Sequence, residues 1–403
     1  MGWGSISGVR EMTTEERRRR LGVRHALAPG ATAADPLGAA TSVVALHATD
    51  APTVFLAVRA RADQGSPAAV QDALYERRSL VRMLGMRRTM FVVPSPMLPI
   101  VEASTMQRIA ATQRRLLVRH LHEAGVPDAD RWLADVEAGT LAALDARGGT
   151  ATANELSTDE PRLRTTLLMA EGKPYEARTT ITNRVLTVLG ADGRIVRGRP
   201  TGSWLSQRYR WALAEQWLPV PLDRPSETEA RAELTREWLA AYGPAPASDL
   251  QWWTGWTGAQ VKRALADAKA MTVGLEGGGS ALILPDDVDP TPDPGPWVAF
   301  LPALDPTTMG WAQRDWYLGP YSPLLFDRAG NAGPTIWASG RIVGGWAHRP
   351  DGQVAIRLFE EVGAEVTALV DAEAERLSRW LDDIGEVRIV PRFRTPTERE
   401  LSG

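Results

Sequence analysis

Apolar and polar positions in the first hundred residues predict a set of helices followed by a hairpin. Helical spacing of apolar residues extends over residues 13–28, 36–47, about 52–62 and about 67–78. Thr13 and Glu16 fit a capping box before the first helix, and Pro52 suits the first turn of the third. Residues 79–94, SLVRMLGMRRTMFVVP, contain two extended apolar stretches about a Gly-Met turn. Helices followed by a basic hairpin are typical of a winged helix-turn-helix.

The same order of elements returns twice along the chain. In the second copy we expect helices over 99–124 and 129–147, a helix-turn-helix over 150–170, a helix and a strand within 179–198, and the hairpin RGRPTGSWLSQRYRW. A third copy begins near 226, continues through helical residues 247–268 and ends in the strand pair MTVGLEGGGSALIL. The repeat is one of architecture rather than of identical residues.

The chain changes character near residue 285, where PDDVDPTPDPGP predicts a linker. Strand-like stretches follow, with turns at Ser339-Gly340 and Asp351-Gly352, then a helix over 364–383 and a last strand, EVRIV, at 386–390. We therefore expect residues 295–403 to form a compact, mostly β domain.

Composition narrows the class of protein. A chain of 403 residues is long enough for two to four domains, and 44% apolar with 24% charged residues is typical of a globular protein. We see no run of about 18 uncharged apolar residues and no secretion signal, so we expect no membrane span and a cytoplasmic location. The absence of cysteine excludes disulfides, thiolate catalysis and cysteine-ligated zinc.

Charge is distributed unevenly, although the net charge is only −3. Residues 1–125 carry 17 basic against 10 acidic residues, residues 126–250 carry 15 against 18, and residues 251–403 carry 14 against 21. A positive N-terminal third on an acidic body can present a phosphate-binding surface. Only three of the 46 basic residues are lysines, which leaves few candidates for a Schiff-base nucleophile.

The segment VVALHATDAPTV, residues 43–54, places three polar side chains directly after an apolar run. His47 and Thr49 can hold one water between them, and Asp50 can orient the imidazole or join a polar network. The alternative is a buried histidine bonded to backbone, with Thr49 or Asp50 capping the next helix. The residues by themselves favour this structural alternative.

Five arginines lie on the predicted hairpins, and they are Arg82, Arg87, Arg88, Arg197 and Arg199. Phosphate contact and solubilising charge at a sheet edge are equally good explanations of them. Trp252, Trp253 and Trp256 lie on one short stretch, where core packing is the better explanation and base stacking the alternative. The chain contains no P-loop, dinucleotide-binding fingerprint, HExxH or Gly-x-Ser-x-Gly motif.

Five segments in this order make the chain resemble the YcaQ/AlkZ-type winged-helix DNA glycosylases, which unhook DNA crosslinks and excise alkylated bases. They are TSVVALHATDAPTVFLAVRAR, MRRTMFVVP, SDLQWWTGWTGAQVKRAL, FLPALDPTTMGW and PTIWASGRIVGGWAHR. The resemblance implies an α+β fold with three winged helices and a C-terminal β-barrel-like domain around a C-shaped DNA cleft. The corresponding domains would be 1–98, which carries the catalytic motif, 99–222, 223–288 and 295–403.

The resemblance also implies where the chemistry lies. The family's Gln-x-Gln or Gln-x-Asp motif aligns with His47-Ala48-Thr49, so both glutamines are replaced here. We expect His47, Thr49 and Asp50 to act in catalysis without metal or cofactor. Beside the five hairpin arginines, we expect Arg59, Arg61 and Arg341 to contact DNA. The expected partner is double-stranded DNA that carries an alkylated purine, bound by a monomer in the nucleoid without a membrane or an obligatory protein partner.

Three hypotheses about function follow. The first is a monofunctional glycosylase that excises bulky N7-alkylguanine adducts, as in self-resistance to a DNA-alkylating natural product. The second is a non-catalytic DNA-binding regulator or adduct sensor on the same scaffold, which the altered motif allows. The third, a ligand-binding protein without DNA, predicts no basic surface along the hairpins. We favour the first, because His and Thr can still position a water.

Overall fold

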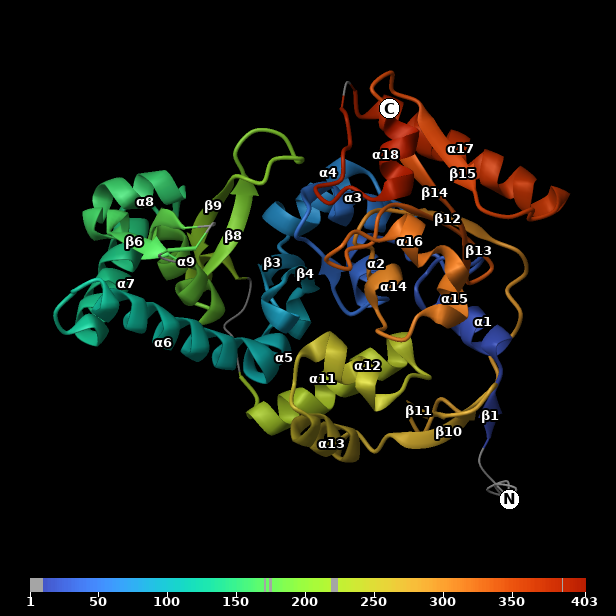
Figure 1. Cartoon of the computed structure of the whole chain (residues 1–403), viewed down its shortest axis with the longest axis horizontal. Helices are drawn as coiled ribbons and strands as arrows, with labels where there is room; N and C mark the ends of the chain where they lie inside the picture. The colour runs from blue at the N-terminus through green and yellow to red at the C-terminus, as the bar shows by residue number, and fades with distance from the viewer. Residues whose placement is uncertain (1–9, 170–171, 174–175, 219–223, 386) are drawn as a thin grey trace. The chain divides into compact units, whose positions relative to one another are not determined.

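The computed structural model describes residues 10–169, 172–173, 176–218, 224–385 and 387–403. The chain forms two compact units, Met1–Gln71 with Arg231–Gly403, and Asp72–Ala230 (Figure 1). Each unit combines helices with antiparallel strands, which confirms the α+β class. The division into four domains stays a prediction.

The N-terminal part of the first unit follows the predicted helices, with one correction. α1, Thr14–Arg24, begins after Thr13, whose hydroxyl accepts the Glu16 N–H at 3.0 Å. α3, Ala51–Arg59, and α4, Pro67–Gln71, are also found. The predicted helix over 36–47 is wrong in its second half, because α2 ends at Thr41 and the chain turns before the short strand β2, Leu46–His47.

Arginines of α1 fix the predicted linker to the helix. Arg20 is buried and donates to the Asp287 carboxylate at 2.8 Å and to the Asp289 carbonyl at 2.6 Å. Arg17 is buried as well, with its guanidinium 4.1 Å from the centre of the Trp316 ring. The RRRR run is therefore not simply a solvated face, and residues 285–296 are tied to α1 at Asp287 and Asp289.

The third predicted set of helices with a hairpin is also found. Its helices are α11, Glu227–Tyr242, α12, Ala247–Thr254, and α13, Gly258–Asp267, and its hairpin joins β10, Met271–Leu275, to β11, Ser280–Ile283. β1, Glu11–Met12, adds to this hairpin parallel to β10. Trp253 and Trp256 are buried, which confirms core packing for those two rings.

The C-terminal part is an open antiparallel sheet covered by helices, rather than a mostly β domain. Its strands are β12, Val298–Leu301, β13, Thr335–Ala338, β14, Arg341–His348, and β15, Val354–Leu358, in sequential order. Its helices are α14, Pro306–Met309, α15, Asp315–Leu318, α16, Ser322–Leu325, α17, Ala364–Asp383, and α18, Pro396–Ser402.

Several predictions for this region are decided by the sheet. Within the described ranges β12 and β15 remain edge strands, so the sheet does not close into a barrel. The turn between β13 and β14 is confirmed, with Ser339 and Gly340 at φ 46° and 84°. The predicted final strand is wrong over 387–390, which have no regular structure, and residue 386 lies outside the described residues.

The second unit contains both basic hairpins, and they share one sheet. β3, Leu80–Leu84, pairs with β4, Met90–Pro94, and β8, Ile195–Pro200, pairs with β9, Tyr209–Leu213. Arg82 of β3 lies opposite Arg197 of β8, so the strand order is β4-β3-β8-β9-β5, with β5 at Thr150–Ala151. The sequence predicted both hairpins, but it did not predict that they would join in one sheet.

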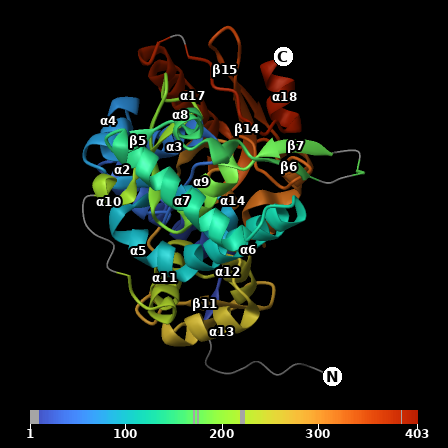
Figure 2. The same ribbon diagram turned by 90° about the vertical axis from the view of Figure 1, so that its left-hand side faces the viewer.

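Helices build the core of the second unit beside that sheet. α6, Gln107–Glu123, packs on α7, Ala129–Ala146, and on α9, Thr182–Ala191, as the view in Figure 2 shows. This unit also contains two short π-helices, Asp72–Glu76 and Glu102–Met106, and the helices α5, Leu98–Val101, α8, Ala153–Asp159, and α10, Ala214–Trp217. The second helix predicted within 150–170 is only the short 3-10 helix Pro161–Arg164, because Thr166–Met169 forms β6, paired with β7, Ala177–Thr180.

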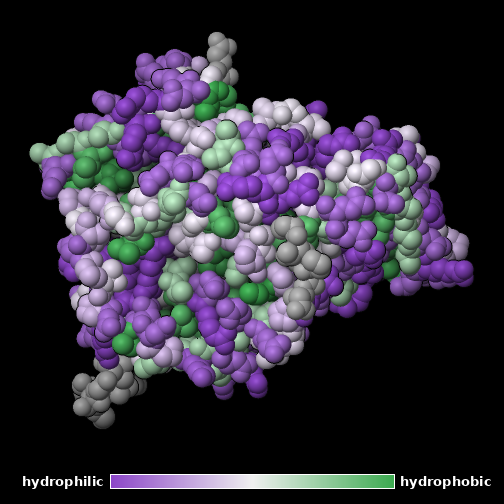
Figure 3. Space-filling model, turned by 180° about the vertical axis from the view of Figure 1, so that it is seen from behind, coloured by the Kyte–Doolittle hydropathy of each residue, from purple (hydrophilic) through white to green (hydrophobic). Residues whose placement is uncertain are grey.

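The face in Figure 3 is mostly hydrophilic, with small separate hydrophobic patches. The large apolar side chains that are exposed among the described residues are Leu168, Met271, Val288 and Val390, which lie far apart in sequence. No helix in the described part of the chain is long and apolar enough to span a membrane.

Candidate functional site

A tight turn delivers the polar segment that begins at His47. The Ala45 N–H donates to the Val43 carbonyl at 2.7 Å, and Val44 between them has φ 65°. A bond between residues two apart about a positive φ is a γ-turn, which is strained, and most of all at a β-branched residue. Tyr242 of α11 donates its buried hydroxyl to the same Val43 carbonyl at 3.0 Å. Contacts from a distant helix thus hold the strained turn.

The three predicted catalytic residues lie between β2 and α3. His47 is buried at the end of β2 with 8% of its surface exposed, and Thr49 is half-buried in the following bend. Asp50, with 4% exposed, is the residue before α3, but its carboxylate does not cap the helix. Instead it accepts the backbone N–H of Arg392 at 3.0 Å. The junction therefore offers His47 and Thr49 at the edge of a buried region, with Asp50 fixed behind them.

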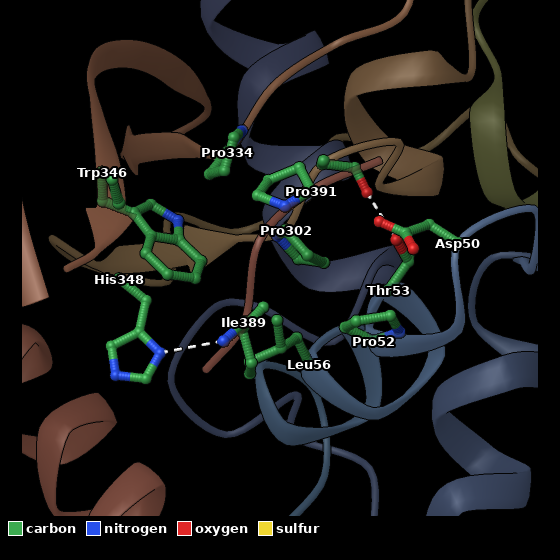
Figure 4. Close-up of a pocket in the computed structure, with 12 residues that line it drawn as sticks. Asp50, Pro52, Thr53, Leu56, Pro302, Pro334, Trp346, His348, Ile389 and Pro391 are labelled. Carbon is green, nitrogen blue, oxygen red and sulfur yellow. Dashed lines mark hydrogen bonds between the residues drawn. The ribbon is translucent and has the colours of Figure 1, made fainter. Parts of the chain in front are cut away.

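A small cavity lies behind the start of α3 (Figure 4). Asp50 lines it from the position before α3 and Thr53 from α3 itself, and Trp346 and His348 line it from β14. Its volume is about 10 Å³, which is room for about one water and too little for a nucleobase. Thr53 donates to the Ala303 carbonyl at 2.8 Å, so this cavity marks where α3 is fastened.

A buried polar network lies in the same unit. Arg61 is fully buried and binds Asp305 through two hydrogen bonds of 2.9 and 2.6 Å, with a third to Thr307 at 2.7 Å. His25 contacts the Thr307 hydroxyl at 2.8 Å and the Ala241 carbonyl at 3.1 Å. Burial and the neighbouring Arg61 charge hold the pKa of His25 well below its usual 6.5. The ring is therefore neutral at physiological pH.

The hairpin arginines of the second unit differ in exposure. Arg87 and Arg88 form the exposed tip between β3 and β4, and both have positive φ. Arg82 is buried with its guanidinium over Tyr209, and Arg197 lies over Tyr209 and Trp211. Arg199 is exposed, although Glu76 binds it. The tip thus offers the more accessible cations of this set.

Comparison with known proteins identifies the family. A sequence model of AlkZ-like DNA glycosylases matches residues 40–380, which is most of the chain. The chain belongs to the AlkZ-like DNA glycosylase family. Its structure is similar to that of the DNA glycosylase AlkZ of Streptomyces sahachiroi, with a TM-score of 0.72 and 19% identity over 92% of this chain and 97% of that chain. At that identity the likeness shows the fold. No curated protein sequence matches the chain.

Membership confirms the family that the sequence resembles, and it identifies the protein as a DNA glycosylase and a DNA-repair enzyme. The matched range includes both the His47 segment and the basic hairpins. The roles of individual residues remain predictions that the geometry can support or weaken.

In this AlkZ-like glycosylase, three of the arginines that the sequence predicted to contact DNA form ion pairs with carboxylates of the protein itself. Arg61 has no exposed surface and is held by Asp305, so we do not carry it into the proposed DNA-binding set. Arg59 binds Glu373 of α17, and both side chains are buried. Arg341 is half-exposed but forms an ion pair with Glu360. Carboxylates already neutralise these three charges.

The residues that sequence reasoning missed are those that hold the His47 segment from a distance. Tyr242 lies almost 200 residues after Val43 in the sequence, and the hydrogen bond from Arg392 to Asp50 spans 342 positions. Neither carries a local motif. A lone tyrosine at the end of a predicted helix gives no signal of its partner, because the partner is set by packing.

Proposed function

We propose that the protein is a monofunctional DNA glycosylase that excises bulky N7-alkylguanine adducts by hydrolysis, with His47 and Thr49 positioning the attacking water. The observation that carries this proposal is the anchored junction between β2 and α3, within the range matched by the family. The Tyr242 bond behind Val43 supports a fixed position for the imidazole.

The chemistry suits a site with few strong groups. Alkylation at N7 makes the guanine cationic, so it leaves as a neutral base without being protonated. Water then forms a bond to C1′ while the bond from C1′ to N9 breaks and its electron pair goes to the base. The proton that the water loses passes to the His47 imidazole, and the Thr49 hydroxyl holds the water oxygen. The products are the free base and an abasic site.

In this proposal Asp50 has two roles, one electrostatic and one structural. A buried carboxylate beside the junction supplies negative potential to a developing oxocarbenium sugar. The same carboxylate accepts the Arg392 N–H, which fixes the start of α3. Asp50 would then act both through its charge and by positioning the segment.

DNA binding in this proposal uses three winged helices, the first two of which carry the basic hairpins β3–β4 and β8–β9. Arg87 and Arg88 are the hairpin arginines whose exposure suits phosphate contact, and Arg199 would join them by exchanging Glu76 for a phosphate. Arg82 and Arg197 shape the sheet beneath them. We propose four domains with the boundaries predicted from the sequence, acting as a monomer on chromosomal DNA.

The second candidate is a DNA-binding regulator or adduct sensor without glycosylase activity. The observation that favours it is the replacement of the family's glutamine motif by His47-Ala48-Thr49. A sensor would bind alkylated duplex tightly and leave the adduct intact. The glycosylase hypothesis remains the better one, because the His47 segment is held rigidly, which binding alone does not require.

Release of a base decides between the two. The protein is incubated in excess with a duplex that carries one N7-alkylguanine adduct, and the released base is measured by mass spectrometry. We expect free alkylguanine and an abasic site in equal amounts, and no strand break before alkali or heat, because no lysine lies near the motif. Binding without release in the wild-type protein would favour the sensor.

A further inference from the structure

A second cavity lies in the other unit, beside the tip of the β3–β4 hairpin. Its volume is about 370 Å³, which is within the range of small-ligand sites. Leu84 and Arg88 come from the hairpin, Gln113 and Leu116 from α6, and Asn183 and Arg184 from α9, with Leu117 and Thr187 between them. None of these eight lining residues is acidic. The lining is therefore cationic and rich in donors, with three leucines beside the two arginines, the two amides and one threonine.

Two arginines in this cavity keep their charge. Arg88 donates to the amide oxygen of Gln113 at 3.2 Å, and Arg184 bonds Nδ1 of His120 at 2.6 Å. Over the described ranges neither guanidinium lies within 4.0 Å of a carboxylate. Arg114, on the same helix as Gln113, is instead held by Glu137 and Asp192. Uncharged partners orient Arg88 and Arg184 without neutralising them.

His120 acts as an acceptor in this arrangement. A guanidinium only donates, so the Nδ1 atom that it meets must carry a lone pair. Partial burial and the Arg184 charge lower the pKa of His120, which keeps this ring neutral. Partial burial also lowers the pKa of Arg184, as expected for a cation without an anionic partner. An anion in the cavity would relieve that cost.

We propose that this cavity is a binding site for one backbone phosphate of DNA. Arg184 and Arg88 bind the phosphate oxygens, and Leu84 and Leu116 contact the adjoining deoxyribose. The Gln113 and Asn183 amides supply further donors at its rim. A phosphodiester suits the cavity because a compact anion is joined there to an apolar sugar, and backbone contacts of this kind fix a protein's register on DNA. The inference rests on the proposed DNA binding and not on the excision step.

The test uses full-length protein and undamaged duplex, so that it does not depend on excision. Affinity is measured by fluorescence anisotropy over a series of salt concentrations, for wild type and for Arg184→Gln. Removing one phosphate-binding charge should lower the slope of log affinity against log salt by about 0.9. Duplexes in which single phosphates are replaced by neutral methylphosphonates then locate the bound phosphate. At one position, the methylphosphonate should weaken DNA binding by the wild type but not by Arg184→Gln.

Arg131→Gln is the matched control, because Arg131 is an exposed arginine of α7 in the same unit and its removal changes the charge equally. It should keep both the salt slope and the methylphosphonate pattern. Arg184→Lys should keep the slope and weaken binding, since the charge remains without the two-pronged donor. His47→Ala should show the wild-type pattern, which separates this inference from the catalytic proposal.

Three results overturn the proposal. The first is an unchanged slope and pattern in an Arg184→Gln protein whose circular dichroism matches the wild type. The second is a lower salt slope for Arg184→Gln while every methylphosphonate that weakens binding of the wild type also weakens binding of the variant. The Arg184 charge would then act only at long range. The third is that inorganic phosphate removes the part of the affinity that depends on Arg184, while no methylphosphonate position shows a difference between wild type and Arg184→Gln. The cavity would then bind a free anion rather than DNA.

Discussion

The arginines of the two units show how burial and partner decide what the same side chain does. In the first unit Arg61 is fully buried and its charge is balanced by Asp305. In the second unit Arg88 is exposed and bonded to an uncharged amide, so its charge remains available. Both look alike in the sequence, as arginines within segments of the family resemblance. The first stabilises the fold around the His47 segment, whereas the second is suited to bind an anion.

The largest expected effect concerns the buried pair. Arg61→Ala should lower the free energy of unfolding by roughly 3–5 kcal/mol, because the Asp305 charge would remain buried without its partner. Arg88→Ala, at the exposed tip, should change it by less than about 0.5 kcal/mol. Urea denaturation followed by tryptophan fluorescence measures both. Equal losses in the two variants would remove the contrast between the units.

The next effect tests the His47 segment as a catalytic element. His47→Ala and Thr49→Ala should each slow excision by roughly 10²–10³, the scale for one positioned catalytic group. The double variant should lose much less than the product of the two, since both act on one water. Single-turnover base release measures the rates, and anisotropy should show unchanged DNA affinity. Wild-type excision by a folded double variant would return His47 to a structural role.

A pH effect on stability separates the buried network from the surface. The pKa of His25 is well below 6.5 when folded, and near 6.5 in the unfolded chain. Below pH 6.5 the unfolded chain therefore binds the extra proton, so stability falls with falling pH by up to about 1.4 kcal/mol per pH unit until the folded pKa is reached. Above pH 6.5 this histidine contributes no slope.

Urea denaturation at several pH values checks this expectation. His25→Gln should be less stable overall, because its two hydrogen bonds are disturbed, but its stability should depend less on pH. His122→Gln, in an exposed histidine of α6, is the control and should keep the wild-type slope. Identical slopes in all three proteins would contradict the proposed role of the buried ring.

A smaller effect sharpens the link between the aromatic core and the site. Tyr242→Phe should slow excision roughly tenfold, because the Val43 carbonyl loses the hydroxyl that holds the strained turn. Tyr317→Phe is a matched control, since its buried hydroxyl donates to Thr308 at the same 3.0 Å but not to the turn. Both should cost about 1 kcal/mol of stability. A loss of kcat without a change in KM, confined to Tyr242→Phe, distinguishes positioning from general destabilisation.

The smallest effect is on the salt dependence of binding. Replacing Arg87 and Arg88 together with Ala should weaken binding to all duplexes alike and lower the salt slope by about 1 for each phosphate that the variant no longer binds. Arg328→Ala with Arg379→Ala removes the same charge from exposed sites of the first unit and should leave the slope unchanged. Equal slopes in both double variants would show that the hairpin tip has no special part in binding.

Local pattern determined most of the elements of this protein. The helix over 364–383 and the hairpins at 79–94 and 197–211 were readable because apolar spacing and turn residues act over a few positions. The same reasoning failed at 42–47, where the chain leaves α2 and enters a γ-turn about Val44. An apolar run there reads as a continued helix, and only the distant contact of Tyr242 shows otherwise.

The sequence by itself also determined the family, through segments whose order is distinctive, and it singled out His47, Thr49 and Asp50 as the polar cluster. Only the tertiary structure decided which arginines are available to DNA, since Arg61 meets Asp305 across 244 positions and Arg59 meets Glu373 across 314. It also decided that Asp50 holds Arg392 rather than the helix start. Charge balance depends on which residues packing brings together, and no spacing within a single chain encodes that directly.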